Sequence, residues 1–155
     1  MKPLQIERVS GALWWRRICS WIKEHHRHHA PPQGWRYGFV ASRGGAVVGV
    51  AVIGRPVARA LSGAEVTRLC TWGSSRARYG AASALLRAAA DAEPEIVTYT
   101  LAIEGGASLR AAGWVEEARL RPRRWSCPSR PRAPAKHETY AKVRWRPAQK
   151  TTEMP

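Results

Sequence analysis

Apolar side chains recur with two different spacings along this chain. From residue 11 to 24, large apolar residues, several of them tryptophan, return every three or four positions, with cationic residues between them. That spacing predicts an amphipathic helix with Ser10 as a candidate N-cap. The paired prolines and the glycine of residues 31–34 cannot continue a helix, so they predict a loop after it.

Three shorter apolar runs predict β-strands. Residues 35–41 and 46–53 are separated by a segment with two glycines, which is typical of an antiparallel hairpin. The second run is almost wholly apolar and is expected at the centre of a sheet. Residues 64–70 alternate and predict a strand with side chains on two faces. We expect one face to carry Val66, Arg68 and Cys70, and the other to carry Glu65, Thr67 and Leu69.

The second half of the chain alternates between helical and strand-like segments. Residues 79–92 are rich in Ala, Leu and Arg and favour a helix, and residues 96–101 favour a strand. Glycines on both sides bound a short predicted helix at 107–112. Strand-like runs follow at 114–120 and 140–145, separated by a proline-rich connector.

The order of these segments predicts the fold class. Helix, hairpin, strand, helix, strand, helix and two strands give an α/β domain of the layered α+β type, in which a central mixed β-sheet is flanked by helices. A chain of 155 residues, 45% of them hydrophobic, commonly builds one core. We expect one domain over residues 1–147 and a disordered basic tail over 148–155.

Positive charge is the strongest signal in the composition. Lys and Arg total 26 against 11 Asp and Glu, which gives a net charge of +15. Such a field attracts phosphates and indicates DNA or RNA as a partner, although a composition rich in Arg, Ala and Gly raises the charge without any such function. Residues 119–150 hold 11 of the cations and one acid, and predict a nucleic-acid-binding surface. The candidate binding residues are Arg123, Arg124, Arg130 and Arg132.

Cysteine usage and apolar run length indicate the compartment. The cysteines Cys19, Cys70 and Cys127 lie far apart, so neither a disulfide framework nor a zinc module is indicated. No run approaches the roughly 18 apolar residues of a membrane span, and the first residues lack the apolar region of a signal peptide. We therefore expect a reduced, cytoplasmic protein without a membrane partner.

Several blocks of this sequence together resemble the GNAT superfamily of N-acetyltransferases. They are the apolar strand before Glu65, the strand–turn–helix of residues 66–86, and the segment 106–114 with its Ala-Ala-Gly-Trp corner. More narrowly, blocks between residues 25 and 145 resemble a family of phage and prophage GNAT-like proteins. The resemblance implies a GNAT-like fold and an acyl-CoA cofactor, either acetyl-CoA or another acyl-CoA.

A weaker similarity is to the Mom-type DNA adenine-modification enzymes of phages. In that group a His-Tyr pair precedes a Pro-x-Gly motif. Alignment on Pro32-Gln33-Gly34 places His26 at the histidine and Arg27 at the tyrosine. This similarity implies a site near the histidine-rich segment of residues 25–34, which we call the histidine loop. The missing tyrosine departs from the pattern.

The GNAT resemblance also implies where the cofactor binds. In that superfamily the pantetheine lies between two splayed strands, and the pyrophosphate binds to main-chain amides at the following helix N-terminus, which favours anions. The corresponding segment here fits the usual pattern imperfectly, and an ordinary loop with an N-cap is the alternative. The implied cofactor-binding residues are Gly73, Ser74, Arg76, Arg78, Gly80 and Ala81.

Transfer to an amine requires a base, and Glu65 in a central strand is the first candidate. A buried strand carboxylate is costly unless it is paired, so the alternative is a structural interaction between Glu65 and Arg68. Leu109 stands where many GNAT enzymes have the tyrosine that protonates the leaving thiolate. Ser108 or Tyr99 would then have to replace it.

Four histidines within residues 25–29 form the sharpest local feature of the chain. Imidazole can act as a base, bind a metal or contact phosphate. No acid or cysteine lies at a complementary spacing, so we expect no metal; a solvated loop and a substrate-facing loop both stay open. We expect His26 and Glu65 to belong to one catalytic site, since the prolines after the histidines would hold this loop beside the sheet.

Three functions follow from these features. The first is an acyl-CoA-dependent N-acyltransferase of GNAT fold, phage-encoded, that acts on an amine of nucleic acid or of a nucleic-acid-associated target. The second is a Mom-like enzyme that modifies DNA adenine and protects DNA from restriction. The third is a catalytically inactive GNAT-like protein that binds nucleic acid.

Overall fold

A computed structural model describes residues 1–155 except 28, 123–127, 130, 132–139 and 151–155. The described residues form one seven-stranded sheet, with the strands in the order β1-β2-β3-β4-β5-β7-β6. The strands are β1 (Leu4–Val9), β2 (Tyr37–Arg43), β3 (Ala46–Gly54), β4 (Ala64–Thr71), β5 (Ile96–Leu101), β6 (Trp114–Leu120) and β7 (Lys142–Pro147). The helices are α1 (Ala12–His25), α2 (Ser75–Arg78), α3 (Ala81–Ala92) and α4 (Ala107–Ala111).

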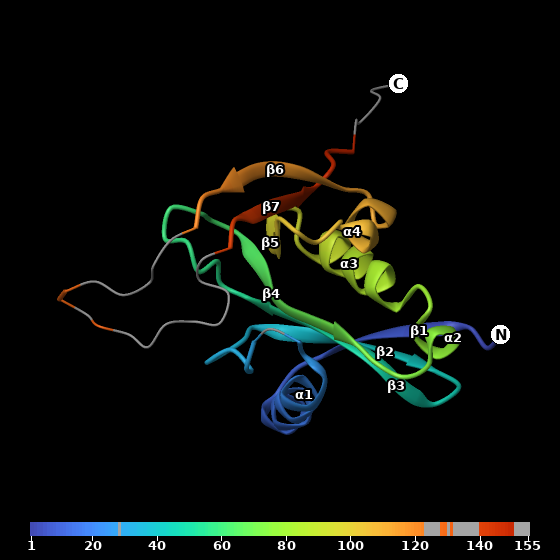
Figure 1. Cartoon of the computed structure of the whole chain (residues 1–155). Coiled ribbons are helices and arrows are strands. Elements are labelled where there is room, and N and C mark those ends of the chain that lie inside the picture. The colour runs from blue at the N-terminus through green and yellow to red at the C-terminus, as the bar shows by residue number, and fades with distance from the viewer. Residues whose placement is uncertain (28, 123–127, 130, 132–139, 151–155) are drawn as a thin grey trace.

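The predicted mixed sheet flanked by helices is confirmed. Every neighbouring pair of strands is antiparallel except β4 and β5, which are parallel. α1 lies on one face of β1–β4, and α3 lies on the opposite face with α4 beside it (Figure 1). We refer to these as the α1 face and the α3 face of the sheet.

Each face of the sheet buries its own apolar cluster. On the α1 face, Ile18 and Ile22 of the helix pack with Val50 and Val52 of β3, and all four are fully buried. On the α3 face the cluster contains buried residues of α3 and α4 with two tryptophans from β6 and β7: Leu85, Leu86, Leu109, Trp114 and Trp145. The almost wholly apolar β3 contributes to both clusters, as a central strand should.

Three local expectations are wrong. Ser10 is not the N-cap of α1, because Gly11, at φ 91°, occupies that position and no side chain caps the helix. The sequence pattern also missed β1, which is a short, mostly exposed edge strand. The helix expected from residue 79 begins instead at Ala81, because Gly80 has a left-handed conformation and separates it from α2.

The expected alternation along β4 fails at a bulge. Val52 pairs with Arg68 and its neighbour Ile53 pairs with Val66, so Thr67 is an extra residue in the ladder. As a result Val66 belongs to the α3-face cluster while Cys70 belongs to the α1-face cluster. The correction matters for function because it places residues on both sides of the bulge on the α1 face.

Candidate functional site

β4 and β5 are paired only at their beginnings. Ala64 pairs with Ile96 and Glu65 with Val97, and the ladder stops there. The hydroxyl of Thr98 donates to the carbonyl of Val66 at 3.0 Å, just beyond the last pair. The rest of the two facing edges carries main-chain groups that no β4–β5 pairing satisfies. We call this part the β4–β5 splay, and its open edges offer strand-like hydrogen bonds to an extended ligand.

Glu65 lies where the splay begins. Its side chain is on the α1 face, since its neighbour Ala64 belongs to the α3-face cluster. Only 6% of the residue is exposed, and its Oε2 accepts a hydrogen bond of 2.8 Å from the amide of Val57. Burial raises the pKa of Glu65, while the Val57 amide, and then Arg68 and Lys142, oppose that rise. A carboxylate with a raised pKa is better suited to accept a proton near neutral pH.

Arg68 joins β4 to the histidine loop. Its Nε donates to the carbonyl of Ala30 at 2.7 Å, and its Nη1 donates to the carbonyl of Thr67 at 2.7 Å. Both of these hydrogen bonds go to main-chain oxygens, whereas the influence of Arg68 on Glu65 is through charge. On the β5 side, Nη2 of Arg27 lies 3.5 Å from Oε1 of Glu104. The histidine loop thus contacts β4 and the turn that follows β5.

His26 follows α1 directly and forms its C-cap. Its Nδ1 accepts a hydrogen bond of 3.1 Å from the amide of His29. In this arrangement the neutral imidazole carries its proton on Nε2. The structure brings the loop that carries His26 to the face on which Glu65 lies.

Tyr99 and Ser108 lie on different sides of the sheet. Tyr99 alternates with Val97, the partner of Glu65, and therefore lies on the α1 face. The side chain of Tyr99 interacts with the guanidinium of Arg144, and this interaction contributes to the raised pKa of Arg144. Ser108 is exposed on α4, which packs on the α3 face, and its neighbour Leu109 is buried in the core at 4% exposure.

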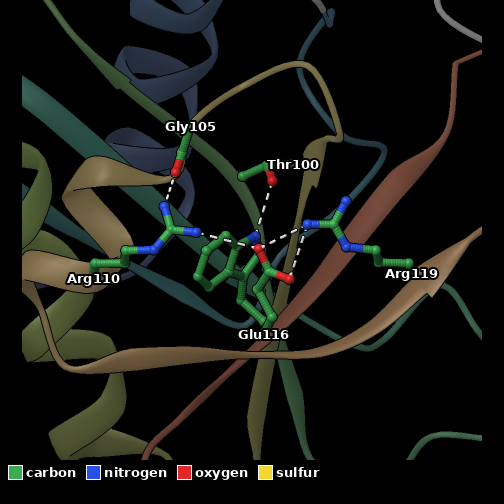
Figure 2. Close-up of polar contacts among 6 residues, drawn as sticks. Thr100, Gly105, Arg110, Glu116 and Arg119 are labelled. Atoms are coloured by element: carbon green, nitrogen blue, oxygen red, sulfur yellow. Dashed lines mark hydrogen bonds and ion pairs between the residues drawn. The ribbon is translucent and has the colours of Figure 1, made fainter.

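The segment between β5 and β6 is fixed by contacts that the sequence did not reveal (Figure 2). Nε1 of Trp145 donates to the hydroxyl of Thr100 at 2.9 Å, and a side chain at Gly106 would collide with the same tryptophan ring. Arg110 donates to the carbonyl of Gly105 and contacts Glu116 at 3.2 Å. These contacts hold α4 against the end of β5.

The segment after β4 forms the turn that the resemblance assigns to the pyrophosphate. Gly73 has φ 93°, and the hydroxyl of Ser74 caps α2 by accepting a hydrogen bond from the amide of Ala77 at 3.1 Å. Gly80, at φ 76°, precedes α3 and provides no side-chain cap. The first-turn amides of α3, beginning at Ala81, consequently have no capping side chain and are available to an anion.

Arg43 at the end of β2 supports this turn, a role that no sequence pattern indicated. Its Nη1 donates to the carbonyl of Arg76 at 3.0 Å, and its Nη2 donates to the carbonyl of Tyr79 at 2.8 Å. Both carbonyls belong to the last part of α2 and its C-cap. A guanidinium there neutralises the negative end of α2 and fixes the turn.

The structure says little about the predicted nucleic-acid-binding arginines. Arg123, Arg124, Arg130 and Arg132 lie outside the described residues, as does part of the predicted basic tail. In the described part of the chain, no group of three His, Cys, Asp or Glu side chains is arranged to hold a metal ion. None of the described helices is long and apolar enough to span a membrane.

Comparison with known proteins shows similarity in structure and not in sequence. No protein-family model matches the chain, and no curated protein matches it. The ribosomal-protein-S18-alanine N-acetyltransferase of Escherichia coli is similar with a TM-score of 0.62 at 14% identity, over 99% of both chains. Ard1 of Thermoplasma volcanium is similar with a TM-score of 0.63 at 17% identity, over 95% of this chain and 99% of that one.

A third similar structure contains a ligand. It is an acetyltransferase of Bacillus subtilis in complex with CoA, with a TM-score of 0.55 at 12% identity, over 95% of this chain and 100% of the other. At these identities the comparison establishes the fold. The chain has the fold of GNAT acetyltransferases, as the sequence blocks indicated.

Proposed function

We propose that this protein is an acyltransferase that uses acetyl-CoA or another acyl-CoA to modify an amine. One observation carries the proposal: the β4–β5 splay leads directly into a turn with basic residues and uncapped helix amides. An extended amide-containing chain can hydrogen-bond to open strand edges, and a pyrophosphate can bind at the start of α3. Pantetheine and the CoA pyrophosphate have these two chemistries in the same order. The CoA complex among the similar structures supports this choice of cofactor.

The chemistry uses residues at the beginning of the splay. The amine nitrogen attacks the thioester carbonyl carbon, the new C–N bond forms, and the carbon–sulfur bond breaks. Glu65 accepts the proton that the amine loses, because its raised pKa suits that transfer. Tyr99, which lies on the same face of the sheet as Glu65, donates a proton to the departing thiolate, and Ser108 is the alternative donor. His26, in the loop that Arg68 joins to β4, is the residue that we expect to orient the acceptor.

We further propose that the acceptor amine belongs to nucleic acid or to a nucleic-acid-associated target. The net charge of +15 supports this, since a phosphate-rich partner is attracted to such a field. The most specific form of this proposal is that the acceptor is a DNA adenine, as in Mom-type modification. Mass spectrometry of nucleosides from cells that express the protein tests it: a new acyl or amide mass on a nucleoside is expected. Unmodified nucleosides together with acylated protein or small amines would rule out the nucleic-acid acceptor.

Binding of the acceptor has its own test. We expect affinity for single- or double-stranded DNA or RNA to fall as salt rises, because phosphate contacts release condensed counterions. Reversing the charge at Arg123, Arg124 and Arg130 should flatten the slope of log affinity against log salt. Affinity that is indifferent to salt, or a slope unchanged in the triple variant, contradicts the predicted basic surface.

An inactive nucleic-acid-binding protein is the second candidate. It is favoured by Leu109, which is buried in the core where many GNAT enzymes have a tyrosine. Acetyl-CoA separates the two functions: the enzyme should be stabilised by it against heat, and an inactive binder should not. Replacing Arg76 and Arg78 by Glu should abolish this stabilisation, whereas Arg16→Glu on the exposed side of α1 should not. If acetyl-CoA never raises the melting temperature of the native protein, the proposed cofactor is wrong.

A further inference from the structure

Five of the eight tryptophans pack against the α1-face cluster from outside and are only partly buried: Trp14, Trp15, Trp21, Trp35 and Trp72. By contrast, Trp114 and Trp145 are fully buried on the α3 face, and both of their indole nitrogens donate hydrogen bonds within the core. None of the five partly buried indoles has a hydrogen bond to another described residue, and none of their nitrogens is buried, so these N–H groups face water. Several aromatic side chains therefore meet the solvent on one side of the molecule, and the proposed mechanism uses none of them.

A continuous row of planar side chains runs along one flank of α1. Residues spaced by three or four positions on a helix share a flank, and here they are Trp14, Arg17, Trp21 and His25. The guanidinium carbon of Arg17 lies 4.9 Å from the ring centroid of Trp14 and 5.6 Å from that of Trp21, so it contacts both rings. Trp72, directly after β4, continues the row: its ring centroid lies 5.8 Å from that of Trp21 and 4.3 Å from that of His25, with which it is stacked. We call these five residues the aromatic stripe.

Positive charge accompanies the aromatic stripe. Arg17 is exposed and forms no ion pair with a carboxylate in the described part of the chain. Arg16 and Lys23 add two more exposed cations to α1, while the one acid of this helix, Glu24, contacts Nε2 of His25 at 3.7 Å. The guanidinium of Arg17 is therefore available to an anionic partner, and the rings beside it are available to a planar one.

A single-stranded nucleic acid has both of these properties. Its unpaired bases can stack on aromatic rings and on guanidinium planes, and its phosphates are attracted to Lys and Arg. In a duplex the bases are stacked on one another, so stacking on a protein is restricted and the phosphates are the main contact. A membrane surface is less suited, because Ile18 and Ile22 are fully buried against the sheet and leave Leu13 as the one exposed large apolar side chain of α1.

We propose that the aromatic stripe binds a single-stranded segment of nucleic acid. Bases stack on its tryptophan rings and on the guanidinium of Arg17, while the cations of α1 attract the phosphates. Trp72 directly follows Thr71, the last residue of β4, so a strand bound along the stripe reaches the end of the β4–β5 splay. The inference rests on the proposed nucleic-acid acceptor and deepens it, because it names the single-stranded form and a surface separate from the predicted basic segment 119–150.

Two oligonucleotides of equal length separate stacking from charge. One is oligothymidine, and the other carries the same phosphates on abasic sugars, so the ratio of the two dissociation constants measures the contribution of the bases. In fluorescence anisotropy the wild-type protein should bind oligothymidine about fivefold or more tightly than the abasic strand. Arg17→Ala should bring this ratio closer to one. Its matched control is Arg16→Ala, which removes the same charge from the same helix outside the stripe; it should weaken binding of both strands equally and keep the ratio.

Variants of the rings themselves provide a second readout. The double variant Trp14→Leu, Trp21→Leu keeps apolar side chains against the α1-face cluster and should bind oligothymidine severalfold more weakly, with unchanged affinity for duplex DNA. Trp14→Phe, Trp21→Phe should retain most of the preference for bases, because two rings remain. Cooperative thermal unfolding identifies the variants that are folded. Arg17 is exposed, so Arg17→Ala decides the question if a tryptophan variant does not fold.

The outcomes separate this inference from the proposed function. Equal affinity of the wild type for the two strands overturns the stripe as a binding surface and leaves the nucleic-acid acceptor in place, and so does a preference that Arg17→Ala and the folded tryptophan variants retain. Binding to phosphatidylserine vesicles that these variants lose, without any preference for bases, assigns the stripe to a membrane and also overturns the inference. Protein that binds neither oligothymidine nor duplex DNA overturns the stripe and the nucleic-acid acceptor together, while stabilisation by acetyl-CoA tests the acyltransferase separately.

Discussion

The two edges of β4 differ in a way that separates stability from function. Toward β3, the ladder runs along nearly the whole strand, from Glu65 to Thr71, with one bulge. Toward β5, it includes only Ala64 and Glu65. The same backbone is therefore closed on one edge and open on the other. The closed edge joins the apolar β3 to the core, and the open edge leaves strand-like hydrogen-bonding groups for a ligand.

The side chains near the two edges follow the same division. Val50, Val52 and Ile53 of β3 are fully buried and apolar. Near the open edge, Glu65 is a buried carboxyl and Arg68 binds two main-chain carbonyls. Polar groups of this kind cost stability unless they are paired, and the Val57 amide and the carbonyls of Ala30 and Thr67 pair with them here.

Replacing the proposed base at the open edge should have the largest effect. In Glu65→Gln the amide oxygen can still accept the hydrogen bond from Val57, but the side chain cannot take the amine's proton. We expect kcat to fall about 10²- to 10⁴-fold, with little change in affinity for acetyl-CoA. The matched control is Asp91→Asn, which removes an exposed carboxylate that pairs with Lys150 near the C-terminal end of α3. Equal loss in both variants, or full activity in Glu65→Gln, contradicts the role of Glu65.

Removing apolar side chains at the closed edge should instead lower the free energy of unfolding. Ile53 is fully buried, and Ile53→Ala should lower the free energy of unfolding by about 2–5 kcal/mol, because it removes apolar contacts and leaves a cavity. Urea unfolding measures this. Thr67→Ala at the bulge removes a longer hydrogen bond of 3.4 Å to Val52 and should cost about 1 kcal/mol or less. Similar costs for the two variants would contradict the claim that apolar burial, and not this hydrogen bond, stabilises the closed edge.

The variant Arg68→Ala tests whether the histidine loop takes part in acceptor binding at the open edge of β4. Removing the guanidinium in Arg68→Ala releases Ala30, and we expect kcat/KM for the acceptor to fall about tenfold, as for loss of charge-assisted hydrogen bonds. The KM for acetyl-CoA should stay unchanged. Arg27→Ala should have a smaller effect, since that side chain is 80% exposed and its contact with Glu104 is long. A rise in the KM for acetyl-CoA alone would place Arg68 in cofactor binding.

The pH dependence of stability should show the smallest effect. Burial raises the folded-state pKa of Glu65, so the protonated carboxyl favours the folded state. That stabilisation is complete below the ordinary carboxyl pKa of about 4.3 and is lost as pH rises through the raised value. The wild type should therefore lose stability relative to Glu65→Gln as pH increases over this window. Urea unfolding of both proteins at several pH values measures the difference; a constant difference contradicts the raised pKa.

Local sequence patterns were sufficient for the parts of the fold that depend on nearby residues. The run 96–101 and the run 114–120 predicted β5 and β6 with the observed bounds. The bulge at Thr67 was not predictable, because it arises from pairing with β3 and not from the alternation of β4 itself. Strand β1 was missed because an edge strand with mostly exposed residues carries little apolar periodicity.

For the candidate site, too, local sequence patterns could not predict contacts between segments that are far apart in the chain. Glu65 was predicted as a candidate base because transfer to an amine requires one and Glu65 falls in a central strand. Arg43 gave no signal, since its contacts with Arg76 and Tyr79 join segments more than 30 positions apart. The bond from Arg68 to Ala30 likewise spans 38 positions. Contacts of this kind follow from the topology of the sheet and appear only when the strands are assembled.

Hydrogen exchange of the β4 amides tests the central claim most directly. If acyl-CoA binds along the open edge, acetyl-CoA should slow exchange of amides within residues 67–71 and at the start of α3, because the ligand pairs with them. Amides of β3 that already pair with the closed edge should exchange at an unchanged rate. Binding of acetyl-CoA without protection of β4 or α3, or protection spread evenly over both edges, would contradict the claim.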